Sequence, residues 1–223
     1  MIRADLHIHT CYSIDCFTSL DEIVERCLKI GIGCVAVADH NTIDGAMKLR
    51  EMAPFKVIVA EEVQTPAGEI MGLFLSERVP PGLSPQETIS RIRTQGGLVA
   101  IPHPFGRPPF TNTTRLTSPD VLSRVDIIEA FNSRTALSRD IARARELALE
   151  QGKAASAGSD AHTAQEIGRA YVEMEEFDGP RDFLESLSRG TVFGRKSGYT
   201  AHLSSTWARI RKTVLGHSSD SSP

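Results

Sequence analysis

The sequence predicts one α/β domain in which parallel strands are covered by helices, either as a barrel or as a doubly wound sheet. The chain has 223 residues, enough for one sizeable core and short for two. Short apolar runs alternate with amphipathic stretches, and no internal repeat interrupts them before the carboxyl end. Near-continuous apolar strands are typical of parallel sheets that are buried on both faces. These patterns do not choose between the two architectures.

Strands and helices are expected to alternate along the first part of the chain. Leu20, Ile23, Val24 and Cys27 recur at helical spacing, and Gly31 closes the run as a helix stop. The strands expected here cover residues 2–6, 34–38 and 57–60, and the helices cover residues 20–30 and 43–52.

A hairpin and further strand–helix pairs follow. The turn Pro66-Ala67-Gly68 leads into a strand at residues 70–75. An N-cap serine, a first-turn proline and a glutamate three residues on predict a helix that starts at Ser84. Further strands are expected at residues 98–102, 125–131 and 154–157, with a helix at 137–151 before Gly152. The domain is expected to span residues 1–203, and residues 204–223 to form a short basic helix and a flexible tail.

Composition excludes several classes of protein. The net charge of -3 and the 24% of charged residues lack the basic excess of a nucleic-acid coat. No apolar run approaches the roughly 18 residues that span a bilayer, and no signal-peptide pattern opens the chain. We therefore expect a cytoplasmic protein without a membrane partner, and no protein partner can be inferred. Four cysteines without a C-x-x-C pair indicate neither a zinc ribbon nor a disulfide framework.

Histidines and acids gather where the expected strands end. Because the carboxyl ends of parallel strands share one edge of a sheet or one barrel mouth, these side chains are expected to converge. Residues at i and i+2 of a strand point to the same face, so two of them can grip one ion. The residues at these strand ends are His7, His9, His40, Glu61, Glu62, His103, Asp160 and His162.

This set of side chains predicts a metal site. A single histidine at a strand end is more often a capping or core residue. Several histidines and acids placed at the ends of different strands favour metal ligation instead. Imidazole and carboxylate donors suit zinc, manganese or iron. The number of donors exceeds what one catalytic zinc uses, which favours two or three divalent ions that share a carboxylate. No G-x-S-x-G elbow and no dinucleotide-binding glycine motif offers a rival site.

Four motifs in order resemble the PHP (polymerase and histidinol phosphatase) family of metal-dependent phosphoesterases. The motifs are Asp5-Leu6-His7-Ile8-His9, Asp39-His40-Asn41, Pro102-His103-Pro104 and Asp160-Ala161-His162. The resemblance covers about residues 1 to 200. It implies a distorted (β/α)7 barrel, similar to a TIM barrel, with a trinuclear metal centre.

The resemblance also implies which residues hold which ion. One ion would be held by His7, His9, Glu62 and Asp160, a second by Glu62 as bridge and His103, and a third by Asp15, His40 and His162. Glu62 is preferred to Glu61 because it aligns with the family's glutamate at the end of the third strand. Asp15 matches a loop position that is acidic or histidine in relatives.

The chain departs from the family pattern in two respects. Asn41 stands where many relatives carry a second aspartate, and no histidine falls within residues 129–132, so the second ion is expected to be less fully held. The segment between Glu62 and His103 is also short, so the substrate lid of nucleotide phosphatases in this family is expected to be missing or reduced.

The predicted activity is hydrolysis of a phosphate monoester, either a nucleotide or a small metabolite, by a hydroxide that bridges the metals. Bound cations lower the pKa of water and neutralise phosphoryl charge. Asp39 is a candidate for orienting a metal ligand, and Arg107 and Arg134 are candidates for clamping the phosphate. The alternatives are a 5′-3′ exonuclease acting on short oligonucleotides, an amidohydrolase-like enzyme and a non-catalytic accessory barrel.

Overall fold

The structure, a computed structural model, describes residues 1–106, 116–197, 207–209 and 211–213. Its strands are β1 (Ile2–Ile8), β2 (Cys34–Val37), β3 (Lys56–Thr65), β4 (Gly68–Leu73), β5 (Leu98–Ile101), β6 (Ile127–Asn132), β7 (Ala154–Gly158), β8 (Ala170–Met174) and β9 (Thr191–Gly194). Its helices are α1 (Leu20–Ile30), α2 (Asp44–Met52), α3 (Pro85–Thr94), α5 (Pro119–Leu122), α6 (Ser138–Glu150), α7 (Gly179–Ser188) and the 3-10 helix η1 (Ala164–Glu166). The predicted α/β class is confirmed.

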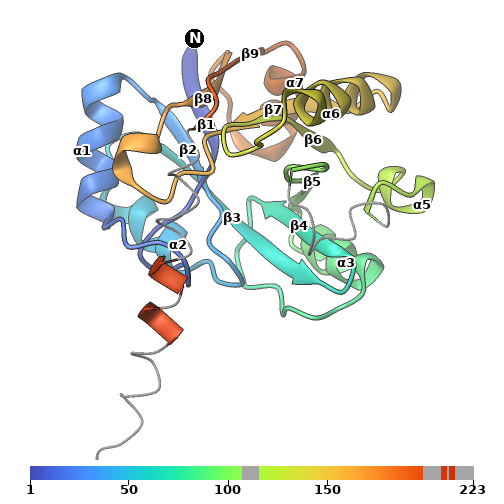
Figure 1. Cartoon of the computed structure of the whole chain (residues 1–223), viewed down its shortest axis with the longest axis horizontal. Coiled ribbons are helices and arrows are strands. Elements are labelled where there is room, and N and C mark those ends of the chain that lie inside the picture. Colours follow the sequence, from blue (N-terminus) through green and yellow to red (C-terminus); the bar gives the residue numbers. More distant parts are fainter. Residues whose placement is uncertain (107–115, 198–206, 210, 214–223) are drawn as a thin grey trace, which may run out of the picture.

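The strands form one sheet in the order β7-β6-β5-β4-β3-β2-β1-β8-β9 (Figure 1). β1, β2 and β3 pair in parallel, as do β5, β6 and β7, whereas β4 is antiparallel to both of its neighbours. The predicted turn after residue 65 is therefore the β3–β4 hairpin. Six parallel strands present their carboxyl ends at the same mouth, as the strand-end argument requires.

Main-chain hydrogen bonds just beyond β7 join this edge of the sheet to the end of β1. The amide of Asp160 donates to the carbonyl of His7 at 2.7 Å, and the amide of His9 donates to the carbonyl of Ala161 at 3.0 Å. A side chain at Gly158 would collide with Cβ of His7, so the close approach requires glycine there. Strands β1 to β7 thus curve into a nearly closed barrel, and the predicted barrel fold is confirmed.

Local sequence signals account for the helix boundaries. Ser19 with Glu22 and Ser84 with Glu87 form capping boxes, so α1 and α3 begin where the sequence predicts. Gly31 ends α1 at φ 72°, in the left-handed region that favours glycine. Five of the described elements have no counterpart among the predictions. They are the helices α5, η1 and α7 and the strands β8 and β9, and the two strands extend the sheet beyond β1.

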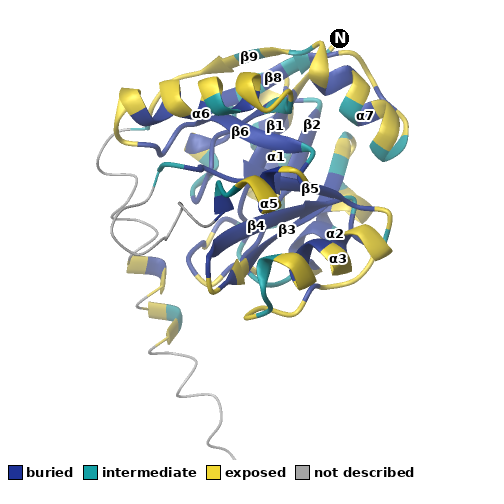
Figure 2. Ribbon diagram, turned by 90° about the vertical axis from the view of Figure 1, so that its right-hand side faces the viewer, coloured by how far each residue is buried: buried dark blue, intermediate teal, exposed yellow. Residues whose placement is uncertain are grey.

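Two apolar layers hold the domain together. One lies between the strands and α1, α2 and α3, and includes Ile8, Ile23 and Leu49. The other lies on the opposite face of the same strands, where small residues such as Ala4, Ala36 and Ala60 pack with larger ones such as Leu6 and Phe183. Strands β2, β4, β5 and β6 are buried throughout, whereas β9 is largely exposed and the helices expose their outer faces (Figure 2). None of the helices among the described residues combines the length and the apolar character that crossing a membrane requires.

The carboxyl end is described only in part. Residues 207–209 and 211–213 are helical. The expected domain boundary at residues 203–204 lies outside the described residues, as does the end of the tail.

Candidate metal centre

A β-bulge in β1 directs the first two histidines into the barrel. The register between β1 and β2 shifts between Asp5 and Ile8. Leu6 belongs to the inner apolar layer, whereas Ile8 belongs to the layer that faces the helices. Simple alternation would place both on one face, so the bulge is what turns His7 and His9 inward.

Four side chains meet at the centre of the mouth, and we call them the central four: His7, His9, Glu62 and Asp160. Nε2 of His7 lies 3.2 Å from Nε2 of His9 and 3.5 Å from Oε2 of Glu62. Nε2 of His9 lies 3.3 Å from Oδ1 of Asp160. Donor atoms that share a tetrahedral zinc ion at about 2.1 Å are separated by roughly 3.4 Å, so these spacings suit ligands of one cation.

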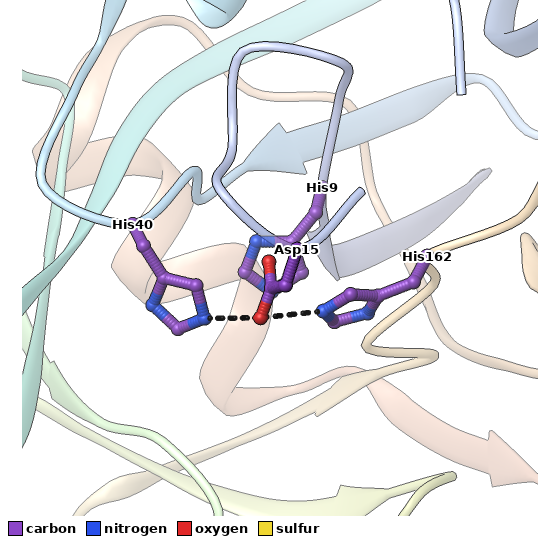
Figure 3. Close-up of side chains that lie close together, drawn as sticks. All are labelled: His9, Asp15, His40 and His162. Carbon is purple, nitrogen blue, oxygen red and sulfur yellow. Dashed lines mark ion pairs between the residues drawn. The ribbon is translucent and has the colours of Figure 1, made fainter. Parts of the chain in front are cut away.

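One side of the mouth, which we call the Asp15 side, consists of Asp15, His40 and His162. Oδ2 of Asp15 lies between the two rings, 3.1 Å from Nε2 of His40 and 3.3 Å from Nε2 of His162 (Figure 3). His9 of the central four lies beside them, and the four side chains form a buried group able to hold a metal ion. Asp15 is on the loop after β1, where the hydroxyl of Ser13 donates to its Oδ1 at 2.8 Å.

The other side, which we call the Glu69 side, consists of Glu69 and His103. Nε2 of His103 lies 2.7 Å from Oε1 of Glu62 and 3.8 Å from Oε2 of Glu69. Oε1 of Glu69 lies 3.4 Å from Nδ1 of His40. The sequence analysis missed Glu69, because it begins an antiparallel strand rather than ending a parallel one. The signal available was the hairpin itself, which pairs Glu69 with Gln64, two residues beyond Glu62.

Neighbouring groups fix how two of the rings are oriented. Nδ1 of His7 lies 3.1 Å from Oε1 of Glu129, and Nδ1 of His162 lies 2.9 Å from the carbonyl of Asp160. Each Nδ1 therefore carries the proton and donates, which leaves the lone pair of Nε2 aimed at the carboxylates of the mouth. Two acceptors facing each other repel unless a proton or a metal cation lies between them.

The pKa values of the histidines and of Glu62 are shifted by burial and by the charges of their neighbours. Burial lowers the pKa of His7, but Glu129, Asp160 and Glu62 raise it well above its usual value. Burial likewise opposes the charge of His40, yet Glu62 and Asp15 raise its pKa to about 9. His9 behaves differently, because burial and the charge of His162 lower its pKa to about 3. Burial disfavours the carboxylate of Glu62, but the surrounding histidines hold its pKa well below the ordinary value.

The residues present fit divalent metal ions. Nδ1 of His9 and Oε2 of Glu62 are buried and make no hydrogen bond to any residue that the structure describes. All nine side chains of the mouth are less than a tenth exposed, and all their donors are nitrogen or oxygen. Such donors suit zinc, manganese or iron, and buried histidines and carboxylates of this density are stable when they bind a cation.

The backbone at the mouth is held in uncommon conformations. Asn41, His103 and Asp160 have positive φ values of 55°, 27° and 53°. Such conformations persist where the surrounding structure enforces them, commonly at functional sites. Asn41 tolerates the left-handed region, and its side-chain oxygen accepts a hydrogen bond from the amide of Gln64 at 2.9 Å. This departure from the family pattern therefore has a structural role here.

The three residues predicted to assist the metals differ in their positions and contacts. Asp39 accepts hydrogen bonds from the amide and hydroxyl of Thr10, both at 2.6 Å, so it secures the loop after β1. Arg134 is buried, and its Nη1 donates to the carbonyl of Asp160 at 3.4 Å, which places it beside the centre. Arg107 lies outside the described residues.

Similarity to known proteins assigns the chain to a family. Residues 5–75 match the model of the PHP domain, and residues 139–192 match a model described as PHP-associated. An uncharacterized protein of Methanocaldococcus jannaschii is 34% identical over 197 residues, which cover 83% of this chain and 79% of that protein. The chain belongs to the PHP family. The predicted family is thus confirmed, and the mouth described above is a candidate metal centre of this PHP barrel.

Solved structures share the PHP fold at low identity. A two-domain protein from Bacteroides vulgatus, which contains a predicted PHP-like metal-dependent phosphoesterase, superposes with a TM-score of 0.70 and 18% identity. The match covers 87% of this chain but 65% of that protein, so the chain spans about two thirds of its length. An amidohydrolase from Chromobacterium violaceum gives a TM-score of 0.63 at 16% identity and covers 86% and 97% of the two chains. At these identities the likeness concerns the fold alone.

Proposed function

We propose that this PHP barrel is a metal-dependent phosphoesterase that hydrolyses a phosphate monoester. The observation that carries the proposal is the convergence of five histidines and four carboxylates at one buried mouth. The residues are His7, His9, Asp15, His40, Glu62, Glu69, His103, Asp160 and His162. Two or three zinc, manganese or iron ions would be held there, with Glu62 shared between the central four and the Glu69 side.

Bound metals would supply two things, a lower pKa for water and compensation of charge on the phosphoryl oxygens. The protein's own residues prepare the site for them. Glu129 and the carbonyl of Asp160 hold the rings of His7 and His162 with their Nε2 atoms facing inward. Asp39, through Thr10, secures the loop that carries Asp15. The mouth is thereby organised before any ligand arrives, which reduces the cost of ordering it.

The substrate class follows from charge. A divalent ion held among His9, Asp15, His40 and His162 would carry more charge than Asp15, the single acid of that group among the described residues. A phosphate monoester carries a charge of about -1.5 to -2 at neutral pH and has oxygens that suit such cations. Amide substrates lack this charge, so the same geometry favours phosphate esters over the chemistry named for the Chromobacterium violaceum protein.

A substrate panel tests the proposal. Metal-free protein is supplied with manganese and incubated with nucleotides, histidinol phosphate and short oligonucleotides, and inorganic phosphate and nucleotide release are measured separately. We expect phosphate release from a monoester that depends on added metal and disappears in His7→Ala. Release of mononucleotides from oligonucleotides would instead favour the exonuclease. Failure of every phosphoester, with metal bound in stoichiometric amount, would refute both.

A further inference from the structure

The described part of the carboxyl-terminal segment, residues 207–209 and 211–213, is attached to the loop that presents Asp15. Nζ of Lys212 donates to the carbonyl oxygens of Cys11, Ser13 and Cys16, each at 2.6 Å. An ammonium group has three protons to donate, and the three carbonyl oxygens of this loop accept all of them. Figure 1 shows the segment as two short helical pieces beside the loop that follows β1. Residues some 200 positions apart in the chain are thus joined at the metal centre.

Aromatic contacts add to this attachment. The rings of Phe17 and Trp207 meet edge to face with centroids 5.7 Å apart. The guanidinium of Arg211 lies over both rings, 5.7 Å and 5.2 Å from their centroids. Ala208 is buried, at 2% exposure. Cation–π and aromatic pairs of this kind are weak individually, so they supplement the hydrogen bonds of Lys212 and do not replace them.

The attachment brings Arg209 to the mouth. Its Nη2 lies 3.6 Å from Oδ2 of Asp15, the same oxygen that faces His40 and His162. The Arg209 side chain is 57% exposed, whereas that of Asp15 is 6% exposed. Arg209 therefore approaches the Asp15 side from solvent, the direction from which a substrate must come.

We propose that Arg209 binds the phosphoryl group of the substrate at the Asp15 side and that Lys212 holds it there. This inference rests on the proposed phosphoesterase function and names a substrate-binding residue for it. A divalent ion among His9, Asp15, His40 and His162 would exceed the charge of the one carboxylate of that group, and Arg209 adds a further positive charge. A phosphoryl dianion is the ligand that compensates both charges, and the planar guanidinium can donate two parallel hydrogen bonds to it.

The stretch between Glu62 and His103 is mostly occupied by β4 and α3. The carboxyl-terminal segment lies on the Asp15 side and provides a cation from outside the barrel. Arg134 differs from Arg209, because it is buried and donates to the carbonyl of Asp160, whereas the Arg209 side chain is 57% exposed.

Binding of inorganic phosphate to the manganese-loaded, full-length protein tests the proposal without any turnover. Isothermal titration is performed on the wild type, Arg209→Ala, Arg209→Lys and Arg189→Ala, and the metal content of each is measured. We expect Arg209→Ala to weaken phosphate binding about tenfold or more with unchanged metal content. Arg209→Lys should keep part of the affinity. Arg189→Ala is the control and should stay within about twofold of the wild type, because its guanidinium pairs with Glu175 and Glu185, which belong neither to the mouth nor to the carboxyl-terminal segment.

Undocking the segment gives a second, independent readout. Trp207 is the single tryptophan of the chain, so its fluorescence reports on this segment alone. Lys212→Met should make Trp207 easier to quench with acrylamide and should weaken phosphate binding as Arg209→Ala does. Equal phosphate affinity in the wild type and Arg209→Ala would overturn the proposal, as would a wild type that binds no phosphate. Either result is distinct from failure of the phosphoesterase proposal, which is judged by ester hydrolysis in the wild type.

Discussion

The Asp15 side and the Glu69 side of the metal centre flank the same central four but are built differently. Asp15 lies on a loop that is secured by Ser13, by Asp39 through Thr10 and by Lys212. Glu69 lies on a strand and is placed by the register of the β3–β4 hairpin. The first side thus depends on side-chain hydrogen bonds and the second on the sheet. Substitutions should therefore affect the two sides separately, except at Glu62 and at His40, whose ring lies 3.1 Å from Asp15 and 3.4 Å from Glu69.

The largest effect is expected from Glu62→Ala. Glu62 lies within 3.6 Å of His7, His9, His40 and His103, so its loss removes a ligand from every part of the mouth. Bound metal after desalting should fall below about one tenth of the wild-type amount. Glu61→Gln is the matched control, because the neighbouring carboxylate faces Val79 instead. Metal analysis that finds equal amounts in Glu62→Ala and the wild type would contradict a shared ligand.

A smaller, side-specific effect is expected from Asp15→Asn and Glu69→Gln. Each removes one carboxylate charge and keeps the size of the side chain, so each should weaken one ion by at least about tenfold and leave the others bound. Titration of metal-free protein with manganese separates the binding steps. If the two substitutions weaken the same step, the division of the mouth into two sides is wrong.

The smallest effect concerns stability and pH. Burial raises the pKa of Glu61 from 4.5 to about 7. The folded state therefore binds this proton more tightly than the unfolded state, and stability falls as pH rises from 4.5 to about 7. Glu61→Gln removes this fall, so its free energy of unfolding relative to wild type should rise by up to ~3 kcal/mol between pH 5 and pH 8. Denaturant unfolding at both pH values measures it, and a pH-independent difference would show that Glu61 ionises freely.

Much of the fold and of the centre could be predicted from the sequence, for physical reasons that also explain the omissions. Capping boxes and helical spacing are local signals, so α1 was predicted with its observed bounds. The strand-end rule found His7, His40 and His162 because parallel strands share one mouth. Asp15 was reached through the family resemblance, since nothing local distinguishes a loop aspartate that points at a metal site.

The omissions depend on contacts between distant parts of the chain. Glu69 enters the mouth because β4 runs against its neighbours, and the sequence showed the hairpin but not the direction of its side chains. The β1 bulge, which turns His7 inward, is a property of the pairing with β2. The attachment of Lys212 to Ser13 joins opposite ends of the chain and has no local signature.

The most direct test of the metal centre is anomalous diffraction at the manganese edge, from crystals grown with manganese. At least two peaks are expected within about 2.3 Å of donor atoms. One should lie among His9, Asp15, His40 and His162, and another should lie beside Glu62 and His103. Peaks found only elsewhere on the protein, with none in contact with Glu62, would contradict a centre shared between the two sides.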